Sequence, residues 1–255
     1  MSSRRDEMLA EMGLTPLWRL RTGSARADAS LADVVGAAAP GSAAVPASSP
    51  SPVVRDERRA AILRMDWTAL RQAVANCFDC ALHAKRNKTV FGVGDENAAW
   101  MFIGEGPGAD EDMQGDPFVG QAGRLLDNML AAIDLKRGEN VYIANIVKCR
   151  PPGNRNPAPD EAQKCEAYLQ RQIELIRPNL IVALGRVAAL NLLARDASIA
   201  SLRGRVVDYK GTPLIVTYHP AYLLRTPGDK AKAWEDLCFA VRTMNGLSEA
   251  RAVPS

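Results

Sequence analysis

Short apolar runs alternate along the chain with longer segments of helical periodicity. The runs predict four strands, at residues 98–103, 141–146, 180–184 and 213–217. Apolar residues spaced three and four apart predict helices at residues 66–75, 120–133, 159–176, 186–193 and 230–244. Buried strands that alternate with helices are typical of a parallel sheet covered on both faces. We therefore predict an α/β fold, with three α/β/α layers around a central, mainly parallel four-stranded sheet.

The amino-terminal part of the chain lacks this pattern. Residues 21–57 are rich in Ala, Pro and Ser, and such a segment buries too little apolar surface to offset its ordering entropy. We predict a disordered linker there, after a short helix within residues 1–20 that docks on its own domain, frays, or docks on a protein partner. The folded domain is then expected at residues 58–247, followed by a tail at 248–255.

Composition and charge exclude several classes of protein. The chain has 255 residues, 47% of them hydrophobic, which is enough for one domain with a sizeable core. A net charge of +3 excludes a gross polycation, so nucleic-acid binding would depend on local basic patches. The charged start argues against a secretory signal, and no run reaches the roughly 20 apolar residues of a membrane span. We expect a cytoplasmic protein with no membrane contact and no disulfides.

Four cysteines have the spacing of a metal site. Cys77 and Cys80 form a Cys-x2-Cys pair, which lets two thiolates face one metal, and Cys149 and Cys165 follow at long range. Four such sulfurs are the ligand set of an iron–sulfur cluster or a structural zinc. The fifth cysteine, Cys238, has apolar helical neighbours and is expected to be an ordinary buried thiol.

The segment Gly-Glu-Gly-Pro-Gly at 104–108 directly follows a predicted strand. Ligand sites in parallel sheets lie beyond the carboxyl ends of the strands. The glycines let the backbone approach a flat ligand, but the segment lacks the Gly-x-Gly-x-x-Gly pattern or the Lys-Ser/Thr of a phosphate loop. Glu105 at this strand end either activates a water molecule or simply caps a turn.

Three further side chains near strand ends have the chemistry to bind a planar base. Phe118 is either a stacking platform, worth about 1–3 kcal/mol per base, or part of the core. Asn145 offers one acceptor and two donors, which match the edge of a pyrimidine or satisfy loop backbone. His219 can stabilise negative charge that develops on a carbonyl oxygen. The other histidine, His83, is a substitute metal ligand or a solvated loop residue.

Together these motifs resemble the uracil-DNA glycosylase superfamily, and most closely the family 4 enzymes of bacteria and archaea. The resemblance covers about residues 66–244, and it rests on the four cysteines and on the segments 104–108, 117–120, 145–152 and 219–222. It implies a monofunctional DNA glycosylase of the bacterial cytoplasm that removes uracil from DNA by hydrolysing the N-glycosidic bond. This reaction is the first step of base excision repair.

The resemblance also implies roles for individual residues. Glu105 would activate the water, and His219 would support the leaving uracil anion, so both are expected to be catalytic. Phe118 would stack on the base, Asn145 would read its edge, and Glu111 would crowd out the 5-methyl group of thymine. The expected substrate-binding residues are Gly106, Glu111, Phe118 and Asn145.

The resemblance implies a [4Fe–4S] cluster with a structural role. Its ligands would be Cys77, Cys80, Cys149 and Cys165. One subgroup of the superfamily carries a histidine in a loop after the Lys-Cys-Arg segment and forms a covalent adduct with uracil. Residues 150–157 contain no histidine, so turnover by hydrolysis is expected here.

The expected partner is uracil-containing DNA, single- or double-stranded, bound by a monomer. Basic side chains on the strand-end face could neutralise phosphates. Leu223 is expected to be exposed and to wedge into the base stack, unless it belongs to the core of a short helix. The expected DNA-binding residues are Lys148, Arg150, Arg155, Arg186, Leu223 and Arg225.

Two other classes of protein remain open on the residues alone. A nucleic-acid-binding module stabilised by zinc or a cluster would explain the cysteines and the basic side chains, but it needs neither Glu105 nor His219. An iron–sulfur electron carrier more often has its cysteines in one short segment, and the spacing here does not.

Overall fold

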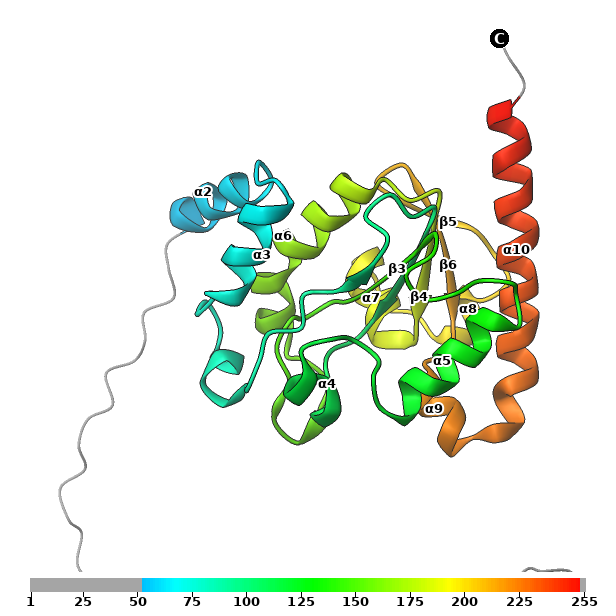
Figure 1. The fold of residues 1–255 in the computed structure, drawn as a ribbon, viewed down its shortest axis with the longest axis horizontal. Helices are drawn as coiled ribbons and strands as arrows, with labels where there is room; N and C mark the ends of the chain where they lie inside the picture. Colours follow the sequence, from blue (N-terminus) through cyan, green and yellow to red (C-terminus); the bar gives the residue numbers. More distant parts are fainter. Residues whose placement is uncertain (1–51, 253–255) are drawn as a thin grey trace, which may run out of the picture. The chain divides into compact units, whose positions relative to one another are not determined.

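The computed structural model describes residues 52–252, with side chains described for residues 56–249 (Figure 1). The predicted helix within residues 1–20, the linker up to residue 51 and the last residues of the tail lie outside the described residues. In the part of the chain that the structure describes, no helix is both long and apolar enough to cross a membrane.

A six-stranded sheet lies at the centre of the described domain, in the order β1-β3-β2-β4-β6-β5. Its strands are β1 Val93–Gly94, β2 Trp100–Gly104, β3 Val141–Asn145, β4 Leu180–Leu184, β5 Val207–Tyr209 and β6 Thr212–Thr217. The four inner strands are parallel and coincide with the four predicted runs, so the α/β class and the parallel centre are confirmed. The sheet as a whole is mixed, because β1 and β5 pair antiparallel at its edges. Strands of two and three residues are too short for patterning to detect.

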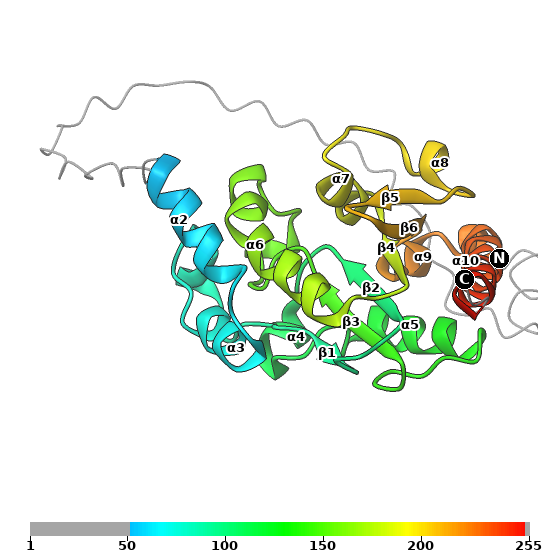
Figure 2. The same ribbon diagram turned by 90° about the horizontal axis from the view of Figure 1, so that it is seen from above.

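Helices cover both faces of the sheet, which confirms the three layers. They are α2 Pro52–Ile62, α3 Trp67–Ala75, α4 Ala109–Gln114, α5 Gln121–Ala131, α6 Pro159–Ile176, α7 Arg186–Leu193, α8 Ile199–Leu202, α9 Pro220–Arg225 and α10 Lys230–Ala252, with 3-10 turns η1 Ala81–Lys85, η2 Pro152–Asn154 and η3 Pro227–Asp229. Side chains along the inner strands alternate between two buried clusters. Met101 and Ile103 pack with residues of α6 and α7, whereas Trp100 and Phe102 pack with residues of α5 and α10. Figure 2 shows these two pairs of helices on opposite faces of the sheet.

The predicted linker ends earlier than expected. Helix α2 begins at Pro52, inside the segment 21–57. Ile62 of this helix is buried beside Tyr168 of α6, and the Arg58 guanidinium donates to the Lys164 carbonyl (3.1 Å). Composition alone could not show that this segment packs on α6. A proline at the first helical position nevertheless favours a helix there.

The predicted tail also begins too early, because α10 continues past residue 247 to Ala252. By contrast, three elements have the predicted bounds. They are Pro159–Ile176, Leu180–Leu184 and Arg186–Leu193, which form α6, β4 and α7. Long apolar periodicity and a fully buried run are the strongest signals in the sequence, and α6 and β4 carry them.

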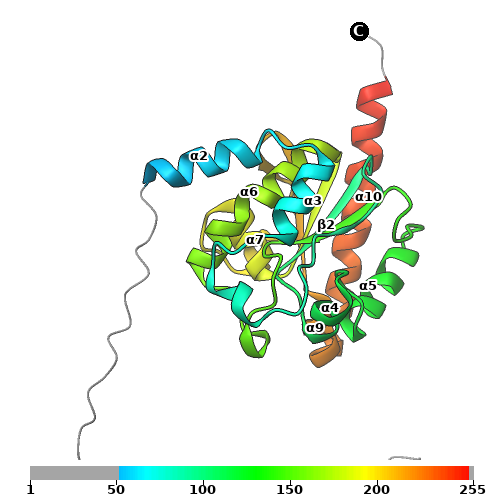
Figure 3. The same cartoon turned by 60° about the vertical axis from the view of Figure 1, so that its left-hand side comes forward.

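Strand register brings the candidate residues together at one end of the sheet. Gly104 at the end of β2 pairs with Asn145 at the end of β3, and Leu184 pairs with Thr217 at the ends of β4 and β6. The loops after these strands therefore leave the sheet side by side. Figures 1 and 3 show α4 and α9, which follow β2 and β6, gathered at this end of the domain.

Candidate active site

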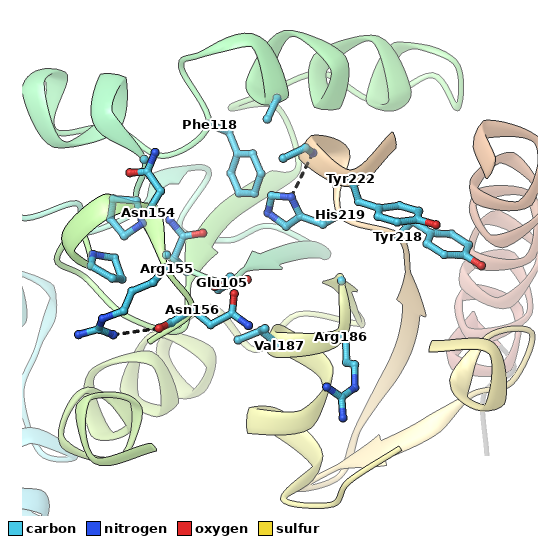
Figure 4. Close-up of a pocket in the computed structure, with 18 of the residues that line it drawn as sticks. Glu105, Phe118, Asn154, Arg155, Asn156, Arg186, Val187, Tyr218, His219 and Tyr222 are labelled. Atoms are coloured by element: carbon cyan, nitrogen blue, oxygen red, sulfur yellow. Dashed lines mark hydrogen bonds between the residues drawn. The ribbon is translucent and has the colours of Figure 1, made fainter. Parts of the chain in front are cut away.

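A pocket of about 700 Å³ opens beyond the carboxyl ends of the four parallel strands (Figure 4). Its walls come from the segments that follow β2, β3, β4 and β6, together with the loop before α5. Most of the predicted site residues line it, namely Glu105, Gly106, Glu111, Phe118, Asn145, Arg155, Arg186, His219 and Arg225. The predicted position of the site, beyond the carboxyl ends of the strands, is therefore the position of the pocket.

Phe118 and Asn145 meet above Gly104. A Cβ atom at Gly104 would lie 2.5 Å from Asn145 Oδ1 and 2.5 Å from the Phe118 ring, so only glycine allows both side chains their positions. Phe118 is buried and adopts a positive φ of 56°, which is uncommon for an aromatic residue. The base-stacking and base-reading candidates are therefore direct neighbours.

The amide of Asn145 has an unused acceptor. Its Oδ1 atom is buried and has no hydrogen-bond partner among the described residues, although the pocket adjoins it. An unsatisfied buried polar atom costs about 1–3 kcal/mol. A ligand with an N–H group on a planar edge would satisfy this atom.

His219 is held as a neutral imidazole with a defined tautomer. Desolvation by burial, with a further contribution from Arg225, lowers its pKa to about 4. The Ala221 N–H donates to His219 Nδ1 (3.1 Å), so the ring proton resides on Nε2. The ring packs beside Phe118, with 5.5 Å between centroids (Figure 4). A neutral N–H donor therefore borders the same space as Phe118.

Glu105 lies in the pocket wall directly after β2. Burial raises the pKa of its carboxyl group above the ordinary value. Its carbonyl accepts a hydrogen bond from the Val147 N–H (3.2 Å), which joins the glycine-rich loop to the segment after β3. A partly desolvated carboxylate is a stronger base than one in water, and this property suits proton abstraction.

Glu111 joins the two loops that carry Glu105 and Phe118. Its carboxylate accepts from the backbone N–H groups of Gly108 (3.0 Å), Val119 (2.9 Å) and Gly120 (3.1 Å). The side chain lines the pocket, but its oxygens are occupied by the backbone. Its position is therefore rigid.

Comparison with known proteins assigns this architecture to a family. The model of the uracil DNA glycosylase superfamily matches residues 91–238. This chain belongs to that superfamily. A type-4 uracil-DNA glycosylase of Archaeoglobus fulgidus is 49% identical to it over 162 residues, 60% of this chain and 81% of that protein. Type-4 enzymes of Thermotoga maritima (43% over 163 residues, 63% and 84%) and Pyrobaculum aerophilum (40% over 185 residues, 69% and 93%) are similar as well. The resemblance to family 4 is thus confirmed.

The prediction that Lys148 binds DNA phosphates is wrong for this glycosylase. Its side chain is 1% exposed, and Nζ donates to the Asn145 carbonyl (3.0 Å) and to Gln172 Oε1 (2.6 Å). Burial lowers its pKa to about 8. The segment after β3 turns into the protein, so this cation cannot reach a phosphate, and it supports the backbone of Asn145 instead.

The expectation that Leu223 is exposed is also wrong. It is 1% exposed and packs with Met129, Ala233 and Leu237. Its neighbour Leu224 is 41% exposed. Helix α9 turns one of these two adjacent leucines towards the protein and the other towards solvent, and the sequence does not show which.

The predicted arginines are at the surface, but most have protein partners. Arg155 forms a two-point ion pair with Glu161 (2.7 and 2.8 Å), and Arg186 pairs with Asp196 (2.6 Å). Arg225 is exposed at the pocket rim. Arg150 does not line the pocket, and its guanidinium donates to Oδ1 of Asn154 in the pocket wall.

The four spaced cysteines converge on one small cavity. Its wall contains Cys77, Cys80, Cys149 and Cys165, together with Arg86, Lys164 and Tyr168. All four are free thiols. The Arg86 guanidinium donates to Cys149 Sγ (3.1 Å), and the Lys148 N–H donates to Cys165 Sγ (3.3 Å). Between residues 52 and 252, however, no three Cys, His, Asp or Glu side chains are close enough together to form a metal site. The structure therefore brings the four thiols to one place without ligand geometry.

The two remaining candidates for this cavity lie outside it. His83 does not line the cavity, and its Nδ1 is 2.7 Å from the Cys80 carbonyl. Cys238 is a partly buried residue of α10, which supports its interpretation as an ordinary thiol.

Sequence reasoning missed several side chains around the pocket. Tyr218 and Tyr222 line it and stack on each other, with 5.3 Å between centroids (Figure 4). Their spacing of four residues beside His219 was a detectable signal. Arg137 donates to the carbonyls of Pro117 and Phe118 (2.8 Å each), and no local pattern indicates that contact.

Proposed function

We propose that this chain acts as a monofunctional uracil-DNA glycosylase in DNA repair and that the pocket at the strand ends is its active site. The observation that carries the proposal is the buried, unpartnered Oδ1 atom of Asn145 beside the Phe118 ring. A flipped uracil would supply a donor for Asn145 Oδ1, the N3–H group on its edge, and a flat face that can stack on the Phe118 ring. Family membership supports the reaction class, and the donor–acceptor pattern supports the base.

Recognition of uracil follows from the amide of Asn145. Oδ1 would accept the N3–H of uracil, and the amide NH₂ group would donate to O4. Cytosine has an acceptor at N3 and a donor at C4, so both contacts would become repulsive. Glu111 would exclude thymine near C5, because its carboxylate is fixed by three backbone N–H groups and cannot move away from a methyl group. Gly106 would keep the loop backbone close to the base.

Bond cleavage places negative charge on uracil and positive charge on the sugar. The electrons of the C1′–N1 bond pass to the uracil ring, where His219 would donate a hydrogen bond from Nε2 to O2. A neutral donor suits this role because it stabilises the anion through a hydrogen bond without giving up a proton to it. Glu105 would accept a proton from the water whose oxygen bonds to C1′.

Contacts with DNA outside the pocket would come from the exposed arginines. Arg150, Arg155, Arg186 and Arg225 surround the opening or lie near it, and phosphates could replace their present partners. Leu224 is a better candidate than Leu223 for a wedge between bases, since it is the exposed member of the pair.

We also propose a [4Fe–4S] cluster at Cys77, Cys80, Cys149 and Cys165. The chemistry of the donors fits, although their present spacing is not that of bound ligands, because four free thiols line one cavity and N–H groups already point at two of the sulfurs. When bound, the cluster would join the segment between α3 and η1 to α6 and to the segment after β3. The residues of the pocket would carry out the hydrolysis without it.

Release of uracil from a labelled oligonucleotide with a single uracil tests the function. Wild-type protein should produce alkali-labile abasic sites, and Glu105→Ala should lower the rate about 10²- to 10⁴-fold, the usual range for loss of a general base. Glu96→Ala is a matched control, because this exposed carboxylate precedes β2 at the opposite end of the sheet and pairs with Arg71. DNA binding without abasic product in the wild type would instead indicate a binding module.

A further inference from the structure

The backbone of Phe118 needs support from other residues. Its positive φ of 56° places an L-residue with a large side chain in the left-handed region, which costs about 1–3 kcal/mol. Helix α5 also approaches it closely, because a Cβ atom at Gly123 would lie 1.7 Å from the Phe118 carbonyl oxygen. A loop in this conformation persists only where its surroundings hold it.

Arg137 holds this backbone from one side. It lies in the turn between α5 and β3, and its guanidinium donates to the carbonyls of Pro117 and Phe118 (2.8 Å each). Nε donates to Asp127 Oδ1 (2.9 Å), so the planar group is fixed by a residue of α5. Three acceptors around one guanidinium match the rigid, forked donors of arginine, and lysine could not satisfy them together.

Glu111 holds the same segment from the other side. Its carboxylate accepts the N–H groups of Val119 and Gly120, while Arg137 takes the carbonyls of the two preceding residues. The peptide that follows Phe118 therefore has its carbonyl bound by a cation and its N–H bound by an anion. This opposed pair fixes the direction in which the Phe118 ring leaves the backbone.

We propose that Arg137 is a positioning residue that presents the Phe118 ring to the flipped uracil. The inference rests on the proposed function. Without the guanidinium, Phe118 can relax to a negative φ, and its ring then leaves the space above Gly104 and beside His219. Arg137 does not line the pocket, so it acts only through Phe118.

A rival role for Arg137 is direct contact with a phosphate, since its side chain is 24% exposed. Free uracil separates the two roles, because it has no phosphate but still stacks on Phe118. Salt dependence separates them independently. Loss of one phosphate contact lowers the slope of log K against log salt by roughly 1, whereas loss of stacking leaves the slope unchanged.

The test compares Arg137→Met with Lys136→Met. Lys136 is the adjacent cation, exposed and paired with Glu139 in the same turn, so its loss removes the same charge without touching Phe118. We expect Arg137→Met to raise the inhibition constant of free uracil and the KM for DNA about 5- to 100-fold, the range for loss of base stacking, with a smaller effect on kcat. Lys136→Met should change neither by more than about twofold.

Two further variants separate positioning from general damage. In a Phe118→Leu background, Arg137→Met should have little additional effect on uracil inhibition, because the ring it positions is absent. Arg137→Lys keeps the charge and should still weaken uracil binding, in protein whose thermal unfolding stays cooperative. An unchanged inhibition constant in Arg137→Met, with or without a lower salt slope, would overturn the inference. Wild-type protein that neither binds nor releases uracil would overturn the proposed function instead.

Discussion

The pocket and the cysteine cavity are built on opposite principles. In the pocket, Asn145 keeps a buried acceptor without a partner among the described residues, and the neutral ring of His219 forms part of the wall. In the cavity, sulfur atoms already receive hydrogen bonds from Arg86 and from the Lys148 backbone. Unpaired groups suit a ligand that enters and leaves, whereas supported sulfurs suit a permanent one. The difference is the one expected between the proposed site for turnover and the proposed site for a structural cluster.

Lys148 connects these two regions. Its backbone N–H donates to Cys165 Sγ, and its Nζ donates to the Asn145 carbonyl. Cys149 follows it directly in the chain, so a single short segment carries both the proposed base-reading residue and a proposed cluster ligand. Loss of the cluster should therefore disturb the position of Asn145 through the backbone. Loss of the Asn145 side chain should leave cluster binding unchanged.

We expect the largest effect from a substitution that removes a ligand of the proposed cluster. Cys149→Ala should lose most of its iron and have a lower melting temperature, because the cluster would tie the segment between α3 and η1 to α6 and to the segment after β3. Cys238→Ala is the control, since this thiol belongs to α10. Iron and sulfide analysis with thermal unfolding measures both variants. Iron content equal to wild type in Cys149→Ala would remove Cys149 from the ligand set.

We expect a smaller effect from a substitution in the pocket that removes the contacts of Asn145 with the base. Asn145→Ala should lower kcat/KM for uracil release about 100-fold, since it removes two hydrogen bonds to the base at about 1–1.5 kcal/mol each. Its iron content should remain that of wild type. Asn191→Ala is a matched control, because this exposed amide of α7 donates only to the Val187 carbonyl of its own helix. Single-turnover kinetics gives the rates, and an unaltered rate would exclude Asn145 from base recognition.

We expect the smallest effect on the pH dependence of stability, to which the buried His219 of the pocket contributes. His219 has a pKa of about 4 when folded, against 6.5 for an ordinary histidine. The unfolded chain therefore binds the extra proton first, and stability that is present above pH 6.5 is lost as the pH falls towards 4. Between pH 7 and pH 5 this loss is about 2 kcal/mol for one such group.

Denaturant titrations of wild type and His219→Gln at pH 7 and pH 5 measure that contribution. The variant should lose less stability than wild type over this interval. Glu105 and Asp236, whose carboxyl pKa values are raised by burial, titrate in both proteins and cancel in the difference. Equal pH dependence of the two proteins would show that His219 is not held neutral by burial.

Much of the fold was predictable because its signals are local. Four apolar runs became the four parallel strands, and the segments after their carboxyl ends became the pocket wall. Glu105, Phe118, Asn145 and His219 lie in short motifs whose residue types already match the chemistry of a base. The edge strands β1 and β5 were not predictable, since two or three residues form no detectable pattern.

Residues whose roles depend on long-range contacts were missed or misread. Lys148 has the sequence context of a phosphate ligand, but a buried partner on α6 takes its amine. Leu223 and Leu224 are equivalent in the sequence and opposite in exposure. Arg137 carries no local signal and acts through contacts with a loop near Phe118.

The sequence by itself determined which chemical groups this protein has and on which strand ends they are placed. Only the tertiary structure decided which of those groups face the pocket, which are paired and which are left open to a ligand. The physical reason is that residue type and spacing are properties of a segment, whereas burial, register and hydrogen-bond partnership are properties of segments brought together. Gly104 is the clearest case, because its neighbours Asn145 and Phe118 come from two distant parts of the chain.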